Sequence, residues 1–95
     1  MQFEWDEDKA LQNRRKHQIS FETAVLAFED ESALIFEDDR FEYDETREIL
    51  IGRPFPAKEQ FLFVVFTERL QDVIRIISAR KATRAETNWY HEQNH

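Results

Sequence analysis

The chain contains no cysteine, a single glycine and two prolines. Without cysteine it can form neither a disulfide nor a thiolate metal site, which is typical of proteins in reducing compartments. The scarcity of glycine and proline argues against a disordered or loop-rich fold. No apolar run approaches the roughly 18 residues of a membrane span, and the first residues lack a signal-peptide pattern. We therefore expect residues 1–95 to form one cytoplasmic domain that does not associate with a membrane.

Acidic residues are in excess, but they are unevenly distributed. The formal net charge is −7, and residues 21–48 alone hold eleven acids and two bases. Residues 49–95 hold seven bases and five acids, so a locally basic surface is compatible with the acidic total. The acidic segment is either a solvated face with a polar loop or a docking surface for a basic partner.

Capping residues and apolar spacing predict a β-α-α-β-β-β-β-α order of elements. The three helices are expected at 6–17, 21–28 and 83–92. The five strands are expected at 3–5, 33–36, 48–53, 60–67 and 73–79, with a charged loop at 38–47 and a turn at 54–58.

These elements predict an α+β fold. The strand at 60–67 is apolar on both faces, so we expect it to be central. Short connections favour an antiparallel sheet of about four to five strands. An N-terminal helical hairpin would cover one face, and the last helix would follow the sheet.

Cations gather where the last strand runs into the last helix. Arg75, Arg80, Lys81 and Arg84 lie within ten positions of one another. Arginine can hold two phosphate oxygens with its planar guanidinium group. This segment therefore suggests a polyanion-binding edge on an otherwise acidic chain.

Four segments, in order, resemble the BrnT family of bacterial ribonuclease toxins. They are Phe3-Glu4-Trp5-Asp6 with Lys9, Asn13, Lys16 and His17; Ile19-Ser20-Phe21-Glu22 with Ala24; Phe63–Arg69; and Arg75–Arg80 with Ala82, Thr83, Glu86 and Tyr90. The resemblance implies a compact RelE-like fold and RNA cleavage without a metal or other cofactor. It also implies a BrnA-type antitoxin, which binds DNA through its other end and bridges the toxins into a hetero-oligomer.

Cleavage of RNA without a metal requires proton transfer and stabilisation of the negative phosphorane. The predicted catalytic residues are His17, Lys16, Arg69 and Arg80. Histidine can exchange protons near neutral pH, although His17 could equally be a half-buried residue at a helix end. Lys16 is better suited to a phosphate contact. Arg69 and Arg80 are expected at opposite ends of the last hairpin, which separates them.

The predicted RNA-binding residues are Lys9, Thr67, Arg75, Lys81, Arg84 and Tyr90. Strand alternation places Arg75 on the face opposite Arg80, and an ion pair with Glu68 or Asp72 is its structural alternative. Thr67 binds phosphate or caps a turn. Tyr90 stacks on a base or docks on the sheet.

Two functions remain open from the sequence. One is a ribonuclease toxin that blocks translation. The other is a binding module of the same fold, which holds an antitoxin or another protein and has weak or lost catalysis. A non-enzymatic nucleic-acid binder is disfavoured by the net charge. We predict no metal site, because His91 and His95 lack convincing spacing with a third ligand.

Overall fold

The computed structural model describes residues 1–42, 44–55 and 60–95. Its elements are β1 (Gln2–Glu4), α1 (Glu7–His17), α2 (Phe21–Ala27), β2 (Leu34–Glu37), β3 (Glu48–Gly52), β4 (Leu62–Arg69), β5 (Val73–Lys81) and α3 (Arg84–Gln93). The predicted order of elements is confirmed. Part of the predicted turn at 54–58 lies outside the described residues.

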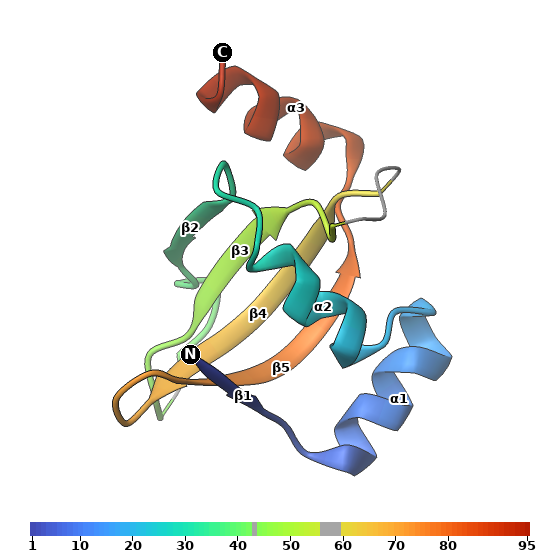
Figure 1. The fold of residues 1–95 in the computed structure, drawn as a ribbon, viewed down its shortest axis with the longest axis vertical. Coiled ribbons are helices and arrows are strands. Elements are labelled where there is room, and N and C mark those ends of the chain that lie inside the picture. Colours follow the sequence, from blue (N-terminus) through green and yellow to red (C-terminus); the bar gives the residue numbers. More distant parts are fainter. Residues whose placement is uncertain (43, 56–59) are drawn as a thin grey trace.

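The strands form one sheet in the order β1-β5-β4-β3-β2 (Figure 1). The strands from β2 to β5 pair antiparallel, as predicted. The first strand differs, because β1 pairs parallel with β5, and Glu4 lies opposite Arg75. The α+β fold with five strands, a helical hairpin and a final helix is therefore confirmed, and the sheet is mixed.

The side of the sheet that α2 covers, here called the α2 face, carries the larger core. From β4 it receives Leu62, Val64 and Phe66, and Phe21 of α2 is fully buried against them. Burial of apolar side chains of this size contributes roughly 1.5–3 kcal/mol each to the stability of the fold. Figure 1 shows α2 lying across β4 and β5 on this side.

The opposite side, here called the α3 face, carries a second cluster. Ile49, Ile51, Phe63 and Val65 pack there with Tyr90 of α3. Both faces of β4 are therefore buried, which confirms its predicted central place.

Local capping explains where the helices begin. The side chain of Asp6 accepts a hydrogen bond from the Lys9 N–H, and Ser20 accepts one from Thr23. Such N-caps satisfy backbone donors that have no partner within the helix. Helix α1 ends at Gln18, whose φ of 59° is left-handed. The reversal lets α2 turn back over the sheet, while α1 lies beside β5.

None of the described helices is long or apolar enough to cross a membrane.

Candidate functional site

Arg80 is held by an aromatic ring on one strand and a carboxylate on the last helix. It lies opposite Phe63 on β4, and its guanidinium carbon is 3.8 Å from the centroid of that ring. Its two terminal nitrogens donate to the Glu86 carboxylate at 2.9 and 3.0 Å. The side chain remains 31% exposed. The aromatic ring and the carboxylate therefore fix the orientation of a guanidinium group that solvent still reaches.

Glu86 also caps α3, so one carboxylate serves two contacts. Its Oε1 accepts the Thr83 N–H at 2.8 Å, while the Thr83 hydroxyl accepts the Glu86 N–H at 3.2 Å. Burial raises the pKa of Glu86, but the hydrogen bonds from Arg80 and Thr83 outweigh burial and hold the pKa below its ordinary value. The ionised carboxylate is thus the form that orients Arg80.

A β-bulge in β5 decides which cations share a face. Phe66 lies opposite Ile76 and Val65 lies opposite Ser78, so β5 has one extra residue at this step. Thr67 lies opposite Arg75, and Phe63 lies opposite Arg80. Because Thr67 and Phe63 are four residues apart on β4, their partners share the α3 face.

The prediction that Arg75 points away from Arg80 is therefore wrong. Strict alternation would separate them, but the extra residue restores them to one side of the sheet. Along β4 the positions opposite Arg75 and Arg80 are separated by about 13 Å, at about 3.3 Å per residue. Ser78 lies between them on the same face, opposite Val65.

Arg69 and Arg75 form a second group at the far end of the hairpin. The Arg75 guanidinium donates to Glu4 at 2.8 Å, and Arg69 lies 4.0 Å from the same carboxylate. The partner of Arg75 is therefore Glu4 of β1, and not Glu68 or Asp72, which the sequence had suggested. Arg69 lies opposite Val73, at the other end of β5 from Arg80, as expected.

The α1 residues form a third group beside β5. Lys9, Lys16 and His17 line one shallow pocket of about 290 Å³, and Ile77 and Ser78 form its β5 side. His17 is half-buried in the last turn of α1, where cations interact favourably with the helix dipole. These α1 side chains therefore meet β5 at the bulge.

Two of the predicted RNA-binding side chains are buried within the protein. Thr67 is buried, and its hydroxyl donates to the Thr46 carbonyl at 2.7 Å. Tyr90 is buried and docks on the sheet, where its hydroxyl donates to Asp30 at 2.8 Å. Burial and the hydrogen bond to Asp30 raise the pKa of Tyr90 above its ordinary value. Neither side chain faces solvent where RNA would lie.

Lys81 and Arg84 are exposed beyond Arg80, at the start of α3. Lys81 lies opposite Leu62, a residue of the α2 face, so it points away from Arg80. The predicted site residues therefore occupy separate places along β5 and α1, and they do not converge in a single pocket.

Sequence reasoning missed Arg40. Its guanidinium carbon lies 5.3 Å from the Phe63 ring centroid, so Arg40 and Arg80 approach the same ring. Both oxygens of the buried Asp38 accept from Arg40, at 2.8 and 2.9 Å. The available signal was that Arg40 is one of only two bases in the acidic segment 21–48.

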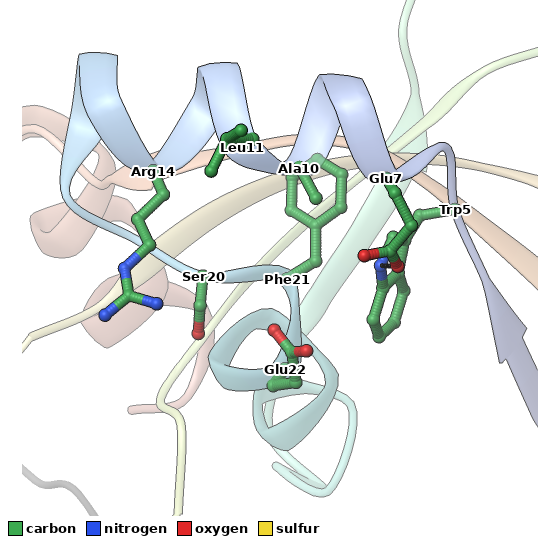
Figure 2. A pocket seen from close by; sticks show the side chains of 8 residues that line it. All are labelled: Trp5, Glu7, Ala10, Leu11, Arg14, Ser20, Phe21 and Glu22. Carbon is green, nitrogen blue, oxygen red and sulfur yellow. Dashed lines mark hydrogen bonds between the residues drawn. The ribbon is translucent and has the colours of Figure 1, made fainter.

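A separate hollow lies between α1 and α2 (Figure 2). It holds about 140 Å³, and Trp5, Leu11 and the buried Phe21 give it apolar walls. Among the described residues, Arg14 is the one basic side chain that lines it, together with Glu7 and Glu22. The other cations discussed above do not line this hollow.

Among the described residues, no three His, Cys, Asp or Glu side chains are grouped so that they could hold a metal ion.

Comparisons with known proteins bear on the function of this arrangement. A family model described as "Ribonuclease toxin, BrnT, of type II toxin-antitoxin system" matches residues 5–86. The chain is 30% identical to the Brucella abortus ribonuclease toxin BrnT, solved by crystallography at 1.1 Å, with a TM-score of 0.67. That match covers 88% of this chain and 99% of the Brucella chain. No curated protein matches. The chain belongs to the BrnT family of ribonuclease toxins of type II toxin–antitoxin systems.

Proposed function

We propose that this chain is a metal-independent endoribonuclease that cleaves RNA in the cytoplasm and so blocks translation. The observation that carries the proposal is the cationic strip formed by α1 and β5. Lys16 and His17 line a pocket with Ser78, and Arg75 and Arg80 flank Ser78 along one face of the strand. Such a strip on a chain of net charge −7 is a local exception that suits a polyanion.

The chemistry assigns different tasks to these groups. Arg80 would stabilise the negative charge that develops on the phosphorane, because its guanidinium is already oriented by Glu86 and Phe63. His17 lines a different pocket from Arg80, so it would transfer a proton at the reacting oxygens when bound RNA spans the two places. Lys16 and Lys9 would hold neighbouring phosphates, because lysine binds phosphate as a point charge.

Arg75 and Arg69 would extend the strip for a longer stretch of RNA backbone. Lys81 and Arg84 would contact RNA where it passes the start of α3. We do not carry Thr67 and Tyr90 into this set, because their hydroxyl groups are buried in hydrogen bonds within the protein.

The family implies an antitoxin protein as the partner. We propose that this partner is a BrnA-type antitoxin that binds DNA through its other end. It would bridge toxin molecules into a hetero-oligomer and neutralise the ribonuclease.

A binding module without strong catalysis is the second candidate. The observation that favours it is that both β5 arginines of the cationic strip form ion pairs with carboxylates. Arg80 pairs with Glu86, and Arg75 pairs with Glu4. RNA must compete with these carboxylates, and a module that only holds an antitoxin would have no need to release them.

The test is to incubate the purified chain with single-stranded RNA in the presence of EDTA and to follow fragments on a gel. The wild-type chain should cut. His17→Ala and Arg80→Lys should slow cutting by about 100-fold or more, the size expected when a proton-transfer or charge-stabilising group is lost. Arg80→Lys keeps the charge but removes the planar fork.

Arg14→Ala is the matched control, because it removes an exposed cation of α1 that lines the separate hollow. It should cut like the wild type. Circular dichroism must show that every variant is folded. Fragments that disappear with EDTA would replace the proposal by a metal-dependent nuclease. Uncut RNA with a folded wild-type chain would favour the binding module, and halted synthesis in a cell-free translation reaction tests the downstream effect.

A further inference from the structure

An apolar groove lies on the α3 face, between the β2 side of the sheet and α3. It has a volume of about 400 Å³, and Ile49, Ile51 and Phe63 contribute apolar surface to it. Phe36 and Trp89 contact each other edge to face, with ring centroids 5.1 Å apart, and also line it. Trp89 is 38% exposed. The groove therefore presents aromatic surface to an incoming group.

The charged groups of this groove are mainly acidic. Four carboxylates and two guanidinium groups line it, so its formal charge is −2. Asp38 binds Arg40 and Glu86 binds Arg80, which leaves Glu37 and Asp39 exposed at the rim. No ion pair joins either of these two to another described residue.

Acidity continues beyond the groove. A neighbouring hollow of about 290 Å³ shares Glu37, Asp38 and Asp39 with it and adds Asp44 and Glu45. This field disfavours a phosphate backbone at the acidic rim of Glu37 and Asp39, so RNA is proposed only at the Arg80 end of the groove. An arginine or lysine is favoured, because its charged end pairs with carboxylates while its aliphatic stem lies against aromatic rings.

The adjoining strand suits a protein occupant. In the described part of the chain, β2 pairs with β3 alone and forms an end of the sheet. Ile35 on this strand is 54% exposed, on the α2 face opposite the groove. The open backbone edge of such a strand can accept an extended peptide, and side-chain pockets beside it give specificity.

We propose that this groove receives a segment of the antitoxin partner that carries arginine or lysine. The inference rests on the proposed function for the existence of that partner, and it adds the chemistry by which the partner is held. Glu37 and Asp39 bind the cation, and Phe36 and Trp89 pack on its stem. A segment in this position lies against Arg80 and excludes RNA from that end of the cationic strip.

The test uses a short acetylated peptide that alternates arginine with leucine, and NMR of the ¹⁵N-labelled chain. The chain has two tryptophans, and they report on different places. Trp89 lines the groove, whereas Trp5 lines the hollow between α1 and α2. We expect the peptide to shift the Trp89 indole N–H signal and to leave the Trp5 signal in place.

Charge variants make the test specific. Replacing Glu37 and Asp39 together by glutamine should weaken peptide binding about fivefold, the effect of removing two exposed ion pairs. Replacing Glu22 and Glu29 by glutamine changes the net charge equally, on the α2 side of the sheet, and should leave binding unchanged. A peptide with glutamine in place of arginine should not shift Trp89.

Three results would overturn the proposal: equal binding of the glutamine peptide, equal weakening by both charge variants, or no shift of Trp89. Guanosine monophosphate is added in a separate titration. If it shifts Trp89 where the arginine peptide does not, the groove is a nucleotide subsite and not a protein-docking site. RNA cleavage is measured separately on the same samples. A chain that binds the peptide but does not cut RNA contradicts the proposed nuclease and leaves the groove assignment standing.

Discussion

The side-chain amide of Asn13 bonds to both backbone groups of Ala79. Its Oδ1 accepts the Ala79 N–H at 3.1 Å, and its Nδ2 donates to the Ala79 carbonyl at 2.8 Å. The same Nδ2 donates to the Ile19 carbonyl at 3.0 Å. Asn13 thus replaces a neighbouring strand at the edge of β5, beyond the three residues that β1 covers.

Asn13→Ala should lower the free energy of unfolding by about 2–4 kcal/mol, because it leaves buried backbone groups without partners. Urea unfolding followed by circular dichroism measures the loss. Gln12→Ala, an exposed neighbour on α1, should change stability by less than about 0.5 kcal/mol. Equal midpoints for the two variants would contradict the role assigned to Asn13.

The contact between Glu86 and Arg80 should make stability depend on pH in the acid range. Because the folded pKa of Glu86 lies below its ordinary value of 4.5, the ionised form stabilises the fold above pH 4.5. That contribution is lost as the pH falls through the folded pKa. Urea unfolding at a series of pH values measures the free energy of unfolding of the wild-type chain and of Glu86→Gln. The wild type should be more stable than the variant, and the difference should be largest near neutral pH. A difference between the two that stays constant down to acid pH would contradict this linkage.

Glu4→Gln should strengthen RNA binding and speed cleavage a few-fold. The substitution removes the charge that holds Arg75 at 2.8 Å and attracts Arg69, so both guanidinium groups become available to phosphate. Glu68→Gln changes the charge equally in the same hairpin and controls for net charge. If both variants change RNA affinity by the same factor, long-range charge explains the effect and the release of Arg75 does not.

Gly52→Ala should destabilise the chain by about 1–2 kcal/mol through overpacking. A Cβ at this position would lie 3.1 Å from Ala33 Cβ, 3.1 Å from Leu50 Cδ2 and 3.2 Å from the Ala27 carbonyl oxygen. Thermal unfolding measures the change, and Gly52→Val should lower the midpoint further. A midpoint for Gly52→Ala at or above that of the wild type would show that Ala27 and Ala33 move away from the added methyl group without cost.

The sequence predicted most elements to within two residues, because their signals are local. The apolar run at 61–66 marked the central strand. Thr83 with Glu86 marked the start of α3 through a capping box that the structure contains. The resemblance to the BrnT family was also readable from short segments. Each of these signals depends on neighbours within a few positions.

The partners of the site residues could not be read in the same way. Glu4 pairs with Arg75 across 71 positions, and Tyr90 bonds to Asp30 across 60 positions. The parallel pairing of β1 creates the first contact and the docking of α3 creates the second. The β-bulge near Ile77 also could not be predicted, because no glycine or proline lies near it in the sequence. Tertiary packing decides these features, and the local pattern does not contain them.

The bulge changes the parity of β5. Before the bulge, odd-numbered positions such as Arg75 lie on the α3 face. After the bulge, even-numbered positions such as Arg80 lie on that face. A mutational scan along this strand would therefore show tolerance to charge that alternates in one phase up to Ile76 and in the opposite phase from Ser78 onward. In a relative without the bulge, the two arginines would lie on the same face of the sheet only if one residue fewer separated them along the strand.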